Sequence, residues 1–233
     1  MLDEIVTIED YETDSLRYDI TVENFHNFFA NGILVHNCQN LKEELDFWRS
    51  SGFTWEVTEK LEGSSMTVYL TDLDVLGGYF GVCSRNMDLL KDENNTFWKV
   101  AIRDGIEEKM RGTILNRNVA IQGELIGPGV QGNIYGLSEP KFMVFDVYDI
   151  SAGGYFPPEA RRQFCEILGL THAPVLETHA KLYDCTMESL IKSADGRSVL
   201  GSLPKREGKV YKCNELDPSF KVISNDYLIG EKD

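Results

Sequence analysis

The chain has 233 residues, 42% of them hydrophobic and 26% charged, a composition typical of a folded rather than a disordered protein. No apolar run reaches the about 18 residues that a membrane-spanning helix requires, and the acidic start Met-Leu-Asp-Glu is unlike a signal peptide. The net charge of −15 argues against a nonspecific nucleic-acid coat, and five cysteines without CxxC spacing argue against disulfides or structural zinc. We therefore expect a cytoplasmic protein.

The first 37 residues differ from the rest in charge and pattern. They hold eight acidic residues and one basic residue, a net charge of −7 against −8 for all that follows. Alternation of apolar and polar residues predicts strands at 4–9 and 16–22. Short apolar runs at 28–29 and 33–35 flank Asn31-Gly32, a dipeptide typical of a β-hairpin. These few short strands cannot close a core alone, so the segment needs a partner.

The segment ends in His36-Asn37-Cys38, whose side chains support cleavage and transfer of a peptide bond. The Asn37 amide can cyclise onto its own carbonyl carbon and break the next peptide bond, while His36 protonates the leaving amine. Cys38 supplies a thiol nucleophile. Taken alone, such a tripeptide is more often a turn with a free cysteine.

The preceding residues change this balance. The strings Tyr18-Asp19-Ile20-Thr21-Val22, His26-Asn27-Phe28 and Asn31 to Cys38 closely resemble the C-terminal half of an intein. The resemblance implies that Asn37 cyclises, that His36 assists, and that Cys38 begins the downstream extein, with Asp19 and His26 as auxiliary groups. It also implies an upstream partner, an intein N-fragment carrying its N-extein. Residues 1–37 are then the all-β (HINT) C-fragment of a split intein, or an intein that has been shortened to its C-terminal fragment.

Residues 38–233 are expected to form one domain, because helical and strand patterns alternate without an internal repeat or a low-complexity linker. Helices are predicted at 41–49, from an Asn95 cap to about 111, at 157–169 and at 186–194. Strands are predicted at 54–70 with a break at 62–65, and at 79–84, 119–126, 142–150, 207–213 and 219–224. This order predicts an α+β fold with antiparallel sheets and flanking helices.

Lys60 stands at the end of a predicted apolar strand, in the string Lys60-Leu61-Glu62-Gly63. A lysine that attacks phosphorus must be neutral, and partial burial or nearby positive charge favours that state. Gly63 would let backbone approach a nucleotide closely. A surface lysine beside a turn is the commoner meaning of such a string on its own.

Further polar residues follow other strands in a fixed order: Ser84-Arg85-Asn86, Gln122-Gly123-Glu124, Phe145-Asp146, Arg206-Glu207-Gly208 and Phe220-Lys221. Together with Lys60 they resemble the motifs of the covalent nucleotidyltransferases, the superfamily of polynucleotide ligases and capping enzymes. The longer strings TEKLEGSS, GVCSRN, QGELIGPGVQGNIY, VFDVYDI, REGKVYK and SFKVISNDYL are most similar to ATP-dependent RNA ligases of the Deinococcus-type branch. The resemblance spans about residues 54–228.

This resemblance implies a role for each motif residue. Lys60 would attack the α-phosphorus of ATP and become lysyl-AMP, which is then passed to a 5′-phosphate end of RNA and displaced by a 3′-hydroxyl. Two Mg²⁺ or Mn²⁺ ions are implied, with Glu207 and Glu124 as candidate ligands. The residues expected at the nucleotide are Glu59 and Leu61 beside the lysine, Arg85 at a phosphate, Glu124 at the ribose, Phe145 against adenine, and Lys221 at the α-phosphate.

Several readings stay open at this point. Many relatives have Asp where this chain has Glu62, and the last motif often has a second lysine where this chain has Ile223. Phe145 is equally suited to a core position. Glu124 and Glu207 have a simpler explanation as solvated strand-end acids, and Gly127-Pro128-Gly129 is interpreted as a turn rather than a phosphate cradle. His172 and His179 lack metal-ligand spacing and are expected to be structural.

The two resemblances join in one hypothesis. An intein interrupts an RNA ligase between an OB-like N-terminal domain and its nucleotidyltransferase domain, and this chain is the downstream precursor, with domains at 1–37 and 38–233. The substrate is then a nicked or broken strand of RNA or of an RNA/DNA hybrid. The alternatives are a splicing partner whose ligase half is inactive until joined, a DNA ligase or capping enzyme, and an adenylate-binding module that seals nothing.

Overall fold

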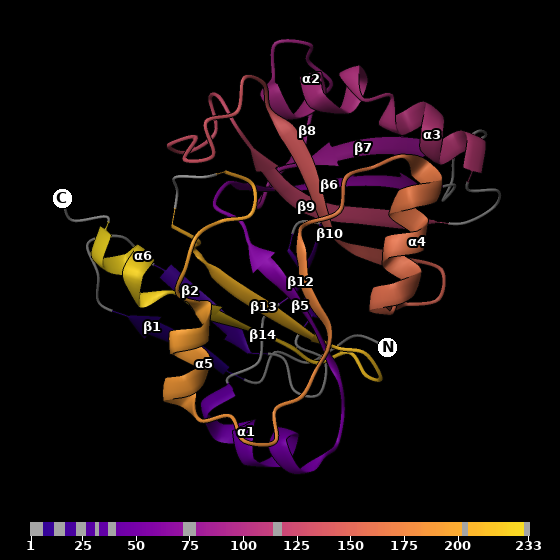
Figure 1. The fold of residues 1–233 in the computed structure, drawn as a ribbon. Coiled ribbons are helices and arrows are strands. Elements are labelled where there is room, and N and C mark those ends of the chain that lie inside the picture. The colour runs from indigo at the N-terminus through magenta and orange to yellow at the C-terminus, as the bar shows by residue number, and fades with distance from the viewer. Residues whose placement is uncertain are drawn as a thin grey trace.

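The computed structural model describes residues 7–11, 17–21, 27–30, 33–36, 41–71, 78–113, 118–201 and 205–230, with side chains from Glu44 onward. Two antiparallel sheets form its centre (Figure 1). The first has the strand order β11-β10-β9-β6-β7-β8, and the second has the order β12-β5-β13-β14. Within the described residues, no helix is both long and apolar enough to cross a membrane.

The six-stranded sheet contains β6 (Ser64–Thr71), β7 (Tyr79–Cys83), β8 (Asp88–Leu89), β9 (Val119–Ile126), β10 (Lys141–Asp149) and β11 (Gly154–Tyr155). Helices α2 (Thr96–Arg103), α3 (Ile106–Thr113) and α4 (Pro158–Leu168) cover one of its faces (Figure 1). Apolar side chains from these helices and from alternate strand positions, such as Met66, Ile121 and Trp98, form the larger core.

The four-stranded sheet contains β5 (Trp55–Lys60), β12 (Val175–Ala180), β13 (Gly208–Cys213) and β14 (Ser219–Ile223). Helices α1 (Leu41–Ser50), α5 (Met187–Ala194) and α6 (Asn225–Gly230) lie on the same side of the molecule as this sheet (Figure 1). The second core packs residues of α1 and α5, such as Trp48 and Leu190, against Trp55, Val57 and Phe220 of the sheet.

Alternation along the strands sends polar side chains to the opposite faces, where the two sheets meet. In β5, Trp55 and Val57 enter the second core, so Glu56, Thr58 and Lys60 point the other way. The same alternation in β9 places Gln122 and Glu124 opposite the apolar core. Contacts across the gap, such as that between Lys212 of β13 and Asp146 of β10, show that these polar faces oppose each other.

Most predicted elements of residues 38–233 are confirmed, including the Asn95 cap of α2 and the left-handed Gly169 that ends α4. The single helix predicted from 95 to 111 is wrong, because Gly105 at φ +59° separates α2 from α3. Strands β8, β11 and β12 and helix α6 were not predicted, because their sequences carry no clear periodic pattern. The α+β class with antiparallel sheets is confirmed.

The described residues of the first segment form two antiparallel pairs of strands. Strand β1 (Thr7–Tyr11) pairs with β2 (Arg17–Thr21), and β3 (Asn27–Ala30) pairs with β4 (Ile33–His36). The predicted hairpin is therefore confirmed in its strands, while the Asn31-Gly32 turn lies outside the described residues. The predicted strand at 4–9 overlaps β1 only in part.

Candidate active site

Lys60 and Glu207 form the centre of the candidate site. Lys60 is the last residue of β5 and pairs in register with Gly208, the first residue of β13, so Glu207 lies just before that strand. The Lys60 Nζ is ion-paired with the Glu207 Oε1. The two side chains are 24% and 16% exposed, which leaves both accessible to a ligand. Residues 147 positions apart in the sequence thus meet where two neighbouring strands pair.

Glu124 and Arg85 approach this pair from the six-stranded sheet. Burial raises the pKa of Glu124 to about 7; the Glu207 carboxylate also raises it, while the positive charges of Lys60 and Arg85 lower it. These interactions place the side chains of Glu124, Glu207, Lys60 and Arg85 in one region. The interpretation of Glu124 and Glu207 as isolated, solvated acids is therefore wrong.

Two buried carboxylate oxygens in this region have no hydrogen-bond partner among the described residues: Oε1 of Glu59 and Oε2 of Glu207. Glu59 is 2% exposed, and its other oxygen accepts the backbone N–H of Val199 at 2.9 Å. A buried acceptor left without a donor is costly, and native proteins rarely keep one without a reason. A ligand that brings donors or positive charge would satisfy both oxygens.

Leu61 and Phe145 belong to a third, smaller core beside the lysine. Leu61 is buried there with Ile126, Tyr135, Met143 and Ala173, and Phe145 packs against it half-buried. Phe145 stands at a bulge of β10, between residues paired with Gly123 and Gln122. The expected contacts of these two side chains with a nucleotide stay predictions.

Lys221 lies in β14 and is exposed. Val210 of β13 pairs with Lys221 on one side and with Thr58 on the other, which puts Lys221 on the same sheet face as Lys60. His36 ends β4, and only its backbone is described. Asn37 and Cys38 lie outside the described residues, so nothing in the structure tests their predicted roles.

Gly63 packs closely against β9, and the expected approach of its backbone to a nucleotide stays a prediction. A Cβ at this position would lie 2.3 Å from the Leu125 carbonyl oxygen, so the glycine is required for close packing of the Lys60 turn against β9. Two tyrosines that contact the turn after Lys60 were not predicted from the sequence. Glu62 donates its backbone N–H to the Tyr135 hydroxyl at 2.7 Å, and the Tyr227 hydroxyl donates to Glu62 Oε2 at 2.6 Å.

At the far end of the same strands lies a second charged group, the ion network, made of Glu56, Asp146, Arg161, Arg162, His172 and Lys212. Arg161, 1% exposed, pairs with Glu56 and with Asp146, and Arg162 also pairs with Glu56. The Lys212 Nζ pairs with Asp146 and donates to the Phe145 carbonyl oxygen at 2.9 Å. His172 is structural, as expected: its Nε2 accepts from Arg161 Nε at 3.0 Å.

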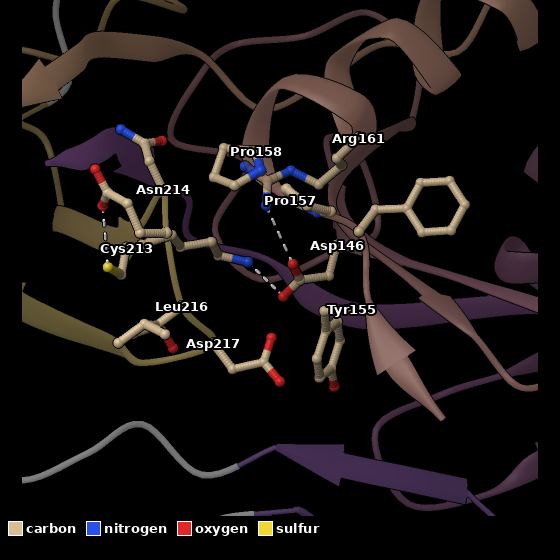
Figure 2. Close-up of a pocket in the computed structure, with 13 residues that line it drawn as sticks. Asp146, Tyr155, Pro157, Pro158, Arg161, Cys213, Asn214, Leu216 and Asp217 are labelled. Atoms are coloured by element: carbon tan, nitrogen blue, oxygen red, sulfur yellow. Dashed lines mark hydrogen bonds and ion pairs between the residues drawn. The ribbon is translucent and has the colours of Figure 1, made fainter. Parts of the chain in front are cut away.

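The ion network forms one wall of a pocket of about 290 Å³ between α4 and the β13–β14 turn. Figure 2 shows Asp146 with its carboxylate directed to Arg161 on one side and to a lysine amine on the other, above Tyr155 and Asp217. Lys60 and Glu207 do not line this pocket. The pocket and the candidate active site are therefore separate.

No set of three His, Cys, Asp or Glu side chains in the described part of the chain is arranged to hold a metal ion by itself. This arrangement still fits Mg²⁺ or Mn²⁺, because Mg²⁺ sites in phosphoryl-transfer enzymes commonly use one or two carboxylates together with substrate phosphates and water. The unpartnered Oε2 of Glu207 is an oxygen of the required kind.

A lysine among carboxylates, between two antiparallel sheets, is an arrangement that suits a nucleophile for a polyanionic substrate. The RNA ligase family model matches residues 53–223, which include every one of these groups. The chain belongs to the RNA ligase family.

Solved structures of Naegleria gruberi RNA ligase resemble this fold. A mutant with ATP and Mn is 36% identical with a TM-score of 0.78, over 90% of this chain and 61% of the other. The structure with PPi is 36% identical with a TM-score of 0.77 over the same shares, and an apo mutant is 39% identical with a TM-score of 0.75, over 83% and 55%. The chain thus spans about 60% of the length of the ligase it matches.

A shorter match, 50% identical over 40 residues, is to DNA topoisomerase 1 of Pyrococcus furiosus. It takes in 17% of this chain and 4% of that protein. A match of this length establishes no shared function.

Proposed function

We propose that the protein is an ATP-dependent RNA ligase that is adenylylated on Lys60. The observation that carries the proposal is the ion pair of Lys60 with Glu207, beside Glu124 and Arg85, at the edge where the two sheets meet. Membership of the RNA ligase family and the ATP and Mn in a Naegleria structure support the same chemistry. The amino-acid sequences of the motifs favour the Deinococcus-type branch.

In the first step, the Lys60 amine attacks the α-phosphorus of ATP. A P–N bond forms, the bond to the β-phosphate oxygen breaks, and pyrophosphate leaves. The Lys60 ammonium must first lose a proton, and Glu207 already accepts a hydrogen bond from it, so this carboxylate is placed to take that proton. A bound Mg²⁺ or Mn²⁺ would neutralise charge on the phosphates and would be held through Glu207, with Glu124 nearby.

The unpartnered Oε1 of Glu59 supports recognition of adenine, because the exocyclic amine of adenine is the kind of donor that this buried oxygen lacks. Phe145 would stack on the base, with Leu61 in the core behind it. Glu124 would bind the ribose, and Arg85 and Lys221 would bind phosphates.

In the later steps, AMP passes from Lys60 to a 5′-phosphate, and a 3′-hydroxyl attacks the activated phosphate and releases AMP. We propose RNA, or the RNA strand of a hybrid, as the substrate. A DNA ligase, a capping enzyme labelled by GTP, and a module that binds adenylate without sealing are the outcomes that would replace this proposal.

We further propose that residues 1–37 are an intein C-fragment and that residues 38–233 are its C-extein. The antiparallel β3–β4 pair, with Asn27 opposite His36, supports this because it is the hairpin that the intein-like string predicts. The partner would be an intein N-fragment that carries the upstream ligase domain.

The test is the intact mass of the purified chain after incubation with ATP and Mg²⁺. We expect the wild type to gain one AMP, Lys60→Ala to gain none, and Lys99→Ala, a matched change of an exposed helical lysine, to behave as wild type. Label on Lys60→Ala would overturn the assignment of the nucleophile. Sealing of a nicked duplex with RNA or DNA ends then identifies the substrate, and a mass lower by residues 1–37 would reveal cleavage at Asn37.

A further inference from the structure

Glu62, two residues after Lys60, is held by two tyrosines from distant parts of the chain. Its backbone N–H donates to the Tyr135 hydroxyl at 2.7 Å, and its Oε2 accepts from the Tyr227 hydroxyl at 2.6 Å. The tyrosines are 73 and 165 residues away in the sequence. One bond fixes the backbone of the Lys60 turn, and the other fixes the carboxylate.

Tyr135 is itself rigidly placed. It is 7% exposed in the small core around Leu61, on a loop closed by hydrogen bonds of 3.1 Å between the Asn133 side chain and the backbone of Leu137. Asn133 has φ +45°, a left-handed conformation that this closure helps to hold. A hydroxyl with so little freedom sets the position of whatever donates to it.

Tyr227 is anchored through the start of α6. Its backbone N–H donates to Ser224 Oγ at 3.2 Å, and Ser224 Oγ donates to Asp195 Oδ1 at 2.8 Å. Ser224 is fully buried, so this link joins α6 to the end of α5 inside the protein. The Tyr227 hydroxyl is therefore delivered to Glu62 by a fixed support.

We infer that Tyr227 and Tyr135 are positioning residues that orient Lys60 for attack on ATP by fixing Glu62, an inference that rests on the proposed function. The turn is short, and Gly63 packs directly on β9, so a shift of Glu62 is transmitted to Lys60. Misplacement of a nucleophile by about 1 Å can lower the rate of a reaction about 100-fold.

The experiment is single-turnover formation of lysyl-AMP at saturating ATP, with ATP affinity measured separately by equilibrium binding, at a temperature well below every variant's melting midpoint. For Tyr227→Phe we expect a rate lower by about 10-fold with ATP affinity within about 2-fold of wild type. Tyr135→Phe should act in the same direction. Tyr183→Phe, at a half-exposed tyrosine on a turn, is the matched control and should leave the rate unchanged.

A double-mutant cycle tests whether Tyr227 acts through Glu62. In a Glu62→Met background, which has no acceptor for the Tyr227 hydroxyl, Tyr227→Phe should lower the rate no further. A full further decrease in that background, or an unchanged rate for Tyr227→Phe in the wild-type background, would overturn the inference. If the wild type forms no lysyl-AMP at all, it is instead the proposed function that fails.

Discussion

The two ends of strands β5 and β13 carry opposite kinds of charged cluster. In the ion network, both oxygens of Glu56 and both oxygens of Asp146 are paired with Arg161, Arg162 or Lys212. Around Lys60, buried oxygens of Glu59 and Glu207 have no donor among the described residues. Saturated charges hold the sheets together, whereas unsatisfied charges cost stability and retain the capacity to bind.

The largest loss of stability should come from breaking the ion network. Arg161→Met would leave Glu56 buried with reduced compensation, and we expect the free energy of unfolding to fall by about 3–5 kcal/mol. Arg103→Met, which removes an exposed arginine paired with Asp104 and Glu139, should cost less than about 1 kcal/mol. Denaturant unfolding of both variants checks this, and equal losses would contradict the assigned role of the network.

At the Lys60 end, removing a buried charge should stabilise the protein. The folded pKa of Glu124, about 7, is above its ordinary 4.5, so the folded state holds the proton more tightly and loses stability as the pH rises through 7. We expect Glu124→Gln to gain up to about 3 kcal/mol at pH 8 and much less at pH 5. Glu166→Gln, an exposed control on α4, should show no such dependence. An equal gain in the free energy of unfolding of Glu124→Gln at pH 5 and pH 8 would contradict this explanation.

The ion network should respond to pH in the opposite sense. Burial, aided by the charge of Arg161, lowers the pKa of His172 to about 4 from 6.5. The folded state then binds fewer protons than the unfolded state between these values, so stability falls as the pH drops from 6.5 toward 4, by about 3 kcal/mol in all. His172→Gln keeps an acceptor for Arg161 and should have a shallower acid slope than wild type. His179→Gln, at an exposed position, should retain the wild-type slope.

The smallest change in stability should accompany the largest change in activity. Lys60→Met removes a partly exposed ion pair, and we expect the free energy of unfolding to change by only about 1 kcal/mol while lysyl-AMP formation is lost. Denaturant unfolding and lysyl-AMP formation, measured on the same sample, test this prediction. A destabilisation as large as that of Arg161→Met would mean that both clusters hold the fold equally.

The candidate nucleophile was predictable from its place in an ordered set of motifs rather than from its local string alone. Lys60 follows an apolar strand and precedes a tight turn, and Glu207 precedes another strand, so residue order indicated where each would lie. The helix cap at Asn95 is a local signal, and the structure confirms it. Strand β12 was missed because its sequence, Val-Leu-Glu-Thr-His-Ala, is half polar and lies at a sheet edge without alternation.

The ion network could not be predicted in the same way. Glu56 and Arg161 are 105 residues apart, and nothing near either one reveals that their elements pack together. The same holds for Glu62 and Tyr227. Period-two alternation shows that Glu56 and Lys60 share a strand face, but only the packing of the two sheets determines which face is filled by arginine and which stays open.

The central position of β5 in its sheet has a consequence for synthesis of the protein. Its partners, β12 and β13, begin at Val175 and Gly208, more than 100 residues after β5 ends. At about 5–20 residues per second, the ribosome needs on the order of 10 s to supply them. During that interval β5, which bears Lys60, has neither of its neighbouring strands. The charge of Glu56 keeps one face of β5 hydrated until Arg161 is synthesised and can pair with it.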